Sequence, residues 1–191
     1  FISDNGGHEA SPSLPLKGKK GTYWEGGLRV PFCARWDGVI PAGQKLSDPV
    51  ISLDIMPTFI KAAGGKVDQA WKLDGVDLIP YMTGKNKDAP HDTLYWAWNG
   101  GRRLAIREGK YKAITNNGGS KFYLYNLRED ISEKTDLSTS KPETLKELTR
   151  KLSKWELSLM RSQWGWNKKL GYKVPGFGKP EPYHDPDYVI E

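Results

Sequence analysis

The sequence of 191 residues is 37% hydrophobic and 27% charged, which is typical of one globular domain with a small addition. Its net charge of +6 favours anionic partners, but the basic residues are spread along the chain, so a solvated basic surface is the simpler explanation. No run is long and apolar enough for a transmembrane helix, and Cys33 is the only cysteine, which excludes a disulfide within the chain.

The N-terminal half has the features of an α/β fold. Residues 1–3 and 30–36 have the composition of strands, and a long loop rich in Gly, Lys and Pro lies between them at 8–29. Cys33 falls in the second expected strand, where we expect a buried thiol. Because the sequence begins inside an expected strand and without Met, we expect a preceding segment.

A helix is predicted over residues 52–65, where apolar residues at helical spacing end at a pair of glycines. The face expected to be buried comprises Leu53, Met56, Ile60 and Ala63.

After residue 90 the pattern changes to that of a small antiparallel sheet. Four short β-prone runs alternate with turn sequences rich in Gly and Asn, which predicts a β-meander. These runs are residues 93–98, 102–107, 111–115 and 122–125. A helix over 141–161 follows, in which Ser140 and Glu143 fit a capping box. Its apolar stripe comprises Leu145, Leu148, Leu152, Trp155 and Leu159.

The expected domain organisation has three parts. Residues 1–90 form the end of an α/β sheet domain, 91–163 the small antiparallel sheet with its packed helix, and 164–191 an irregular tail rich in Gly, Pro and Tyr.

The first 31 residues carry the densest chemical signal. Asp4 and Asn5 follow the first expected strand and offer oxygens that suit Ca²⁺ or Mg²⁺, although Asp-Asn-Gly is also a common turn sequence. Residues 17–22 form a basic cluster flanked by glycines, which suits an oxyanion but equally a solvated loop. His8 is close enough in sequence to face a substrate or to protonate a leaving oxygen, or it is a solvated loop histidine.

The ordered set of motifs resembles the sulfatase family of the alkaline-phosphatase superfamily, over residues 1 to about 160. The matching stretches are Ser3–Gly7, Leu16–Thr22, Trp24–Pro31, Leu94–Trp96, Ala105–Lys112, Leu124–Leu127 and Asp136–Leu137. The resemblance implies an arylsulfatase-like hydrolase of sulfate esters, of which this chain is the C-terminal portion. It implies an alkaline-phosphatase-like α/β fold for the first part.

The resemblance also implies roles for single residues. Asp4 and Asn5 match two ligands of a metal ion, usually Ca²⁺, with Mg²⁺ as an alternative. Lys20, directly before Gly21 and Thr22, matches the lysine that binds the sulfate oxygens. Glu25 is expected to hold the loop rather than to react.

The family's nucleophile does not match any residue of this chain. Sulfatases use a formylglycine made from the Cys or Ser of a Cys/Ser-x-Pro-x-Arg motif. The run beginning at Cys33 does not fit this motif, and the run Ser13–Lys17 ends in Lys and lies in the wrong place. We therefore expect the formylglycine on a missing N-terminal part, which would be this chain's partner, and no turnover by the chain alone.

Further candidates for substrate binding lie in the small sheet. Trp98, Asn99 and Arg102 flank a Gly-Gly turn, and an aromatic ring beside a cation could hold a sulfated sugar. Alternation along the strand equally suits Trp98 as a packing residue.

Two alternatives to a sulfatase stay open. One is a related phosphoryl or phosphonate hydrolase of the same superfamily. The other is a non-catalytic module that binds a sulfated glycan through its basic surface, with nucleic acid a less favoured ligand and no membrane expected. The resemblance favours a periplasmic or extracellular protein.

Overall fold

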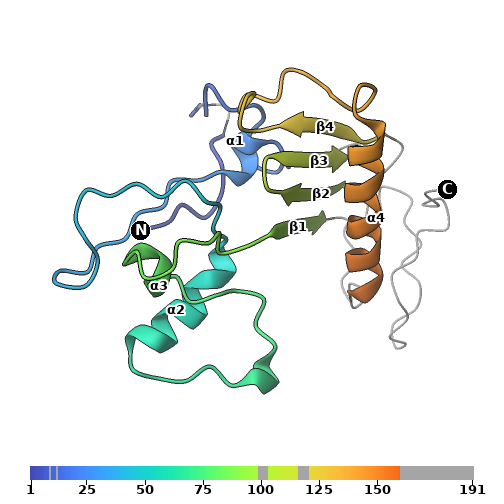
Figure 1. The fold of residues 1–191 in the computed structure, drawn as a ribbon. Helices are drawn as coiled ribbons and strands as arrows, with labels where there is room; N and C mark the ends of the chain where they lie inside the picture. The colour runs from blue at the N-terminus through green and yellow to red at the C-terminus, as the bar shows by residue number, and fades with distance from the viewer. Residues whose placement is uncertain (9, 12, 99–102, 116–120, 160–191) are drawn as a thin grey trace, which may run out of the picture. The chain divides into compact units, whose positions relative to one another are not determined.

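The structure is a computed structural model that describes residues 1–8, 10–11, 13–98, 103–115 and 121–159 (Figure 1). Contacts divide the chain into two compact units, one made of Phe1–Asp4 and Pro31–Asp92, the other of Asn5–Val30 and the residues from Thr93 onward. Residues 5–30 thus group with the small sheet in this division. The predicted three-part organisation stays a prediction, and the predicted tail lies outside the described residues. Among the described helices, none has the length and apolarity needed to span a membrane.

The first unit joins its two N-terminal segments through a single antiparallel bridge between Ile2 and Phe32. The amide N–H of Cys33 donates to the carbonyl of Phe1 at 2.9 Å, and the N–H of Ser3 donates to the carbonyl of Pro31 at 3.1 Å. The predicted strand over 30–36 is therefore reduced to this bridge. Cys33 is exposed, as are its neighbours through Val39, so the prediction of a buried thiol is wrong because no described segment covers this stretch.

The predicted helix of the first unit is confirmed as a short 3₁₀ turn, η1 (Ser52–Asp54), followed by α2 (Ile55–Ala62). The helix ends where Gly64 adopts a positive φ of 78°, a conformation that glycine takes without strain. The unit also contains η2 (Gln69–Trp71) and α3 (Ile79–Met82).

The predicted buried face of α2 is wrong within the described chain. Leu53 and Met56 are 52% and 56% exposed, whereas Pro57 and Thr58 are buried. A hydrogen bond decides which side of the helix is buried. The hydroxyl of Thr58 accepts the N–H of Leu78 at 2.9 Å, which turns this side of α2 toward the segment that follows it.

Asp54 organises the polar interior of the first unit. Its carboxylate is fully buried and accepts hydrogen bonds from the backbone N–H groups of Ile51 and Val76 at 2.8 and 2.9 Å. His91 Nε2 lies 2.9 Å from both carboxylate oxygens. Because these partners come from three different places in the sequence, Asp54 joins three chain segments at the start of the helix.

The second unit is built on a four-stranded antiparallel meander in the order β1-β2-β3-β4 (Figure 1). The strands are β1 (Thr93–Trp98), β2 (Arg103–Glu108), β3 (Tyr111–Thr115) and β4 (Tyr123–Asn126). They agree with the predicted runs to within a residue or two, because each predicted turn sequence separates two strands of alternating pattern.

One face of the sheet carries an apolar core beneath α4 (Pro142–Ser158). Ile106, Ala113 and Leu124 lie side by side on successive strands and are fully buried. Leu148 and Leu152 of α4 pack on them, with Leu145 and Trp155 partly buried beside them, which confirms the predicted stripe except for Leu159, which follows the end of the helix. The predicted capping box is wrong, because Pro142 occupies the first turn and the Ser140 hydroxyl donates instead to the carbonyl of Leu137.

Candidate functional site

The candidate site centres on residues 17–28, which we call the lysine loop and which lie in the second unit. The loop folds back on itself, so that the N–H of Gly26 donates to the carbonyl of Lys17 at 2.7 Å. It ends in the four-residue helix α1 (Glu25–Leu28). A Cβ at Gly26 would lie 2.6 Å from the carbonyl oxygen of Gly18, so only glycine permits this close backbone approach.

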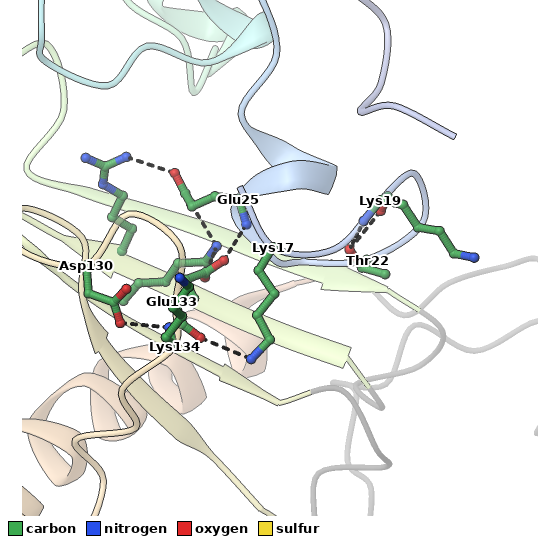
Figure 2. Close-up of polar contacts among 9 residues, drawn as sticks. Lys17, Lys19, Thr22, Glu25, Asp130, Glu133 and Lys134 are labelled. Atoms are coloured by element: carbon green, nitrogen blue, oxygen red, sulfur yellow. Dashed lines mark hydrogen bonds and ion pairs between the residues drawn. The ribbon is translucent and has the colours of Figure 1, made fainter. Parts of the chain in front are cut away.

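Lys20 stands at the exposed turn of the lysine loop. Its backbone N–H donates to the carbonyl of Gly7 at 2.8 Å, while its side chain is exposed. The turn is closed by Thr22, whose hydroxyl donates to the carbonyl of Lys19 at 2.7 Å and accepts from the N–H of Lys19 at 3.2 Å (Figure 2). The position of Lys20 is therefore set by its backbone, and its ammonium group is available to a ligand.

Two segments that carry candidate residues pack together here. Asn5 precedes Gly6, and Gly6 lies so close to Gly26 and Gly27 that a Cβ would collide with their backbone. Together with the bond from Lys20 to Gly7, this packs the segment that carries Asn5 against the lysine loop. His8 follows on the same segment and is exposed.

Asp4 and Asn5 provide donors of the right chemistry for a hard cation, one carboxylate and one amide oxygen. Asp4 is exposed two residues after the bridge at Ile2, where its oxygens are accessible. A complete cation site needs about six to eight oxygens, and no group of three or more His, Cys, Asp or Glu gathers around a common point among the described residues. The pair therefore fits a part of a coordination sphere.

Below the lysine loop lies a buried cluster of charges that no single motif predicted. Glu25 is 3% exposed, and Lys112 of β3 and Glu133 are fully buried. Lys112 Nζ donates to Glu25 Oε1 at 2.8 Å and lies 3.0 Å from Glu133 Oε1. Glu133 Oε2 accepts the backbone N–H of Glu25 at 2.7 Å (Figure 2). We call these three residues the buried triad.

Burial sets the electrostatics of the buried triad. Desolvation raises the pKa of Glu133 above its ordinary value of 4.5, although Lys112 and the N–H of Glu25 act in the opposite direction. The Glu133 carboxylate thus pays a desolvation cost that its two donors only partly offset.

A second contact ties the beginning of the lysine loop to aromatic rings. Lys17 Nζ lies 3.8 Å from the centre of the Trp24 ring and donates to the carbonyl of Glu133 at 3.1 Å. Trp24 packs edge-on against Tyr125, and burial raises the pKa of the Tyr125 hydroxyl. Lys17 is therefore engaged within the protein, which leaves Lys20 as the better candidate for an external anion.

The candidates in the small sheet are described only in part. Asn99 and Arg102 lie outside the described residues, and so does the side chain of Trp98. Their neighbour Arg103 holds the lysine loop, because its Nη1 donates to the carbonyl of Gly21 at 2.7 Å.

Sequence reasoning missed Lys112 and Glu133. Alternation in β3 places Lys112 on the same face as Ile114, and a lysine on an apolar face needs a buried acidic partner, so this signal was available. Glu133 gives no such signal, because it lies in a turn with a positive φ of 52°.

A comparison with protein families shows which family the chain belongs to. Residues 19–163 match the model of the family described as N-sulphoglucosamine sulphohydrolase, C-terminal. The chain belongs to this sulfatase family. The match includes residues 19–28 of the lysine loop, Lys20 among them, together with the whole sheet and α4.

Relatives and solved structures agree with this assignment. The chain is 39% identical to human steryl-sulfatase over 105 residues, which cover 50% of this chain and 18% of that protein. It is 28% identical to mouse arylsulfatase J over 203 aligned positions, which cover 81% of this chain and 34% of the relative. The chain thus spans less than a fifth of the first and about a third of the second.

The fold is that of solved sulfatases. The structure of Ps i-CgsB in complex with k-i-k-neocarrahexaose superposes with a TM-score of 0.79 at 35% identity, over 90% of this chain and 39% of that chain. The sulfatase PsFucS1 from Pseudoalteromonas sp. shares the fold with a TM-score of 0.66 at 24% identity, over 81% of this chain and 36% of that chain. The chain is thus a mixed α/β structure that matches a part of sulfatases with an alkaline-phosphatase-like fold.

Proposed function

We propose that this chain is the C-terminal part of a hydrolase of sulfate esters and that the lysine loop binds the sulfate group. The observation that carries the proposal is the packing of the segment that bears Asn5 against the loop that bears Lys20, within a chain of a sulfatase family. The segments that carry a candidate metal ligand and a candidate anion-binding lysine thereby lie in contact.

Each residue has a role in this proposal. Lys20 places an ammonium group, with three N–H donors, against the non-bridging oxygens of the sulfuryl group and stabilises the charge that grows as the ester bond breaks. Asp4 and Asn5 contribute oxygens to a Ca²⁺ or Mg²⁺ site, where the cation supplies Lewis-acid stabilisation of the same group. The exposed His8 is the candidate that protonates the leaving oxygen.

The nucleophile is proposed to lie on a part of the enzyme outside these 191 residues, as a formylglycine. The substrate class we propose is an aryl or carbohydrate sulfate, on the basis of the arylsulfatase relatives and of the oligosaccharide in the Ps i-CgsB structure. Trp98, Asn99 and Arg102 are the candidates for contacts to the sugar.

The test compares the protein expressed from its complete coding sequence with the isolated 191-residue chain on a chromogenic aryl sulfate. We expect hydrolysis by the first and none by the second, and a Cys/Ser-x-Pro-x-Arg motif in the first. An aryl phosphate of the same leaving group is the control, because preferred hydrolysis of the phosphate would favour the related phosphoryl hydrolase. Turnover by the isolated chain would contradict the assignment of the nucleophile to another part.

A further inference from the structure

The lysine loop needs an anchor, because its own bonds do not fix it to the fold. Residues 17–21 are exposed, and Gly18 and Gly21 both adopt positive φ angles, of 81° and 80°. Glycines at such positions leave many backbone conformations open to the unfolded loop. The conformation that presents Lys20 therefore depends on contacts with the rest of the unit, at the tip through Gly7 and Arg103 and at the base through Lys17 and Glu25.

The register of the sheet places two positive charges next to one another at the base of the loop. Arg107 of β2 lies directly opposite Lys112 of β3, so two cations face the same side of the sheet on neighbouring strands. Like charges at opposed positions are destabilising. Glu25 of the lysine loop reduces this repulsion because its carboxylate pairs with both cations. Oε1 lies 2.8 Å from Lys112 Nζ and Oε2 lies 3.9 Å from Arg107 Nη1.

Glu133 completes the anchor from a second direction. The turn after Glu133 is closed by Asp130, whose carboxylate accepts the backbone N–H of Lys134 at 2.7 Å (Figure 2) and that of Thr135 at 2.8 Å. The turn directs the Glu133 side chain to the N–H of Glu25 and its carbonyl to Lys17. Glu133 therefore contacts the lysine loop both at its first residue and at the start of α1.

We propose that Lys112 and Glu133 are positioning residues, which hold the lysine loop through Glu25 and Lys17 so that Lys20 can reach the sulfate group. The role of Lys20 in this inference rests on the proposed function, whereas the anchoring of the loop does not. The buried triad carries charge into a dry interior, where a lysine and two carboxylates are retained in one geometry by each other. Removing a member is then expected to release the loop before it affects the α4 side of the sheet.

Amide hydrogen exchange measured by mass spectrometry on the 191-residue chain tests the anchoring. We expect Lys112→Met and Glu133→Gln to accelerate exchange of residues 17–28 by about tenfold or more, and by more than they accelerate exchange of α4. The matched control is Lys151→Met. Lys151 also pairs with two carboxylates, Glu108 at 2.7 Å and Glu147 at 3.2 Å, and neither of these partners belongs to the lysine loop. The control should leave loop exchange as in the wild type.

Glu133→Gln decides the test if Lys112→Met accelerates exchange throughout the unit, because the amide oxygen can still accept the N–H of Glu25 while the charge is lost. A larger increase in the loop than in α4 supports the inference. Unchanged loop exchange, or an equal increase in the loop and in α4, overturns it.

Kinetics of the protein expressed from its complete coding sequence test the link to Lys20. We expect Glu133→Gln to lower kcat for an aryl sulfate by about tenfold with a smaller change in KM, because a displaced Lys20 is felt mainly in the transition state. A wild-type kcat in a variant whose loop exchanges faster would overturn the positioning role. If no sulfate ester is hydrolysed by any form, the proposed function fails, and the exchange comparison still decides whether the triad anchors the loop.

Discussion

The two faces of the four-stranded sheet are held by different physical means. Beneath α4 the contacts are apolar, and the ion pair between Lys151 and Glu108 lies at the margin with about a third of each side chain exposed. Beneath the lysine loop, the ion pairs of Lys112 are themselves buried, among aromatic side chains. The apolar face tolerates many equivalent side chains, whereas the charged face accepts few arrangements, and it is the charged face that carries the candidate site.

The difference follows from how each interaction depends on geometry. Apolar burial is roughly proportional to area and is not directional. A buried ion pair is stable only when the partners are well placed, because each charge has lost its water. The sheet therefore provides a stable support on one face and a fixed position for the lysine loop on the other.

The largest effect is expected where a buried charge loses its partner. Lys112→Met leaves the Glu25 and Glu133 carboxylates facing one another without the cation, and we expect the free energy of unfolding to fall by about 3–5 kcal/mol. The exposed counterpart Lys151→Met should cost less than about 1 kcal/mol. Urea unfolding followed by circular dichroism measures both, and equal losses would show that the two faces do not differ in the way described.

A somewhat smaller loss is expected from the apolar face. Leu152 is 1% exposed in the core beneath α4, and Leu152→Ala should lower the free energy of unfolding by about 2–4 kcal/mol through lost burial and the cavity left behind. The lysine loop should keep its native exchange rate under conditions where the variant stays folded. Loop exchange that rises as much as in Lys112→Met would remove the distinction between the faces.

The pH dependence of stability gives a third and smaller contrast. Burial raises the pKa of Glu133 above 4.5, so above pH 4.5 the folded chain retains a proton that the unfolded chain releases. The contribution of Glu133 to stability is therefore present below pH 4.5 and is lost as the pH rises through the raised pKa, by at most about 1.4 kcal/mol per pH unit.

Glu133→Gln should remove this component, so the free energy of unfolding of the wild type relative to the variant should decrease from pH 4.5 toward neutrality. Urea titrations of both proteins across this range provide the measurement. A difference that stays constant or increases with pH would contradict the direction of the shift.

Much of the second unit was predictable from the sequence, and the reason is periodicity. The four strands and α4 follow from alternation, turn residues and the spacing of Leu148 and Leu152, which depend only on local pattern. The ordered motifs also gave the family correctly. The capping box failed because Pro142 starts the helix without a side-chain cap.

The first unit and the buried triad were less predictable, since both depend on contacts between distant segments. The buried face of α2 is determined by the bond between Thr58 and the N–H of Leu78, which the helical pattern does not contain. Glu133 reaches Glu25 across 108 residues of sequence. The roles of Asp4, Asn5, Lys20 and His8 stay predictions, because only a ligand or a reaction can test them.

The most direct test of the central claim is kcat/KM of Lys20→Ala for an aryl sulfate, in the protein expressed from its complete coding sequence. Lys146→Ala, an exposed lysine on α4, is the matched control. We expect Lys20→Ala to lower kcat/KM by about 10²–10³-fold with no change in the free energy of unfolding, and the control to match the wild type. An equal kcat/KM for Lys20→Ala and wild type would contradict the assignment of the lysine loop to the sulfate group.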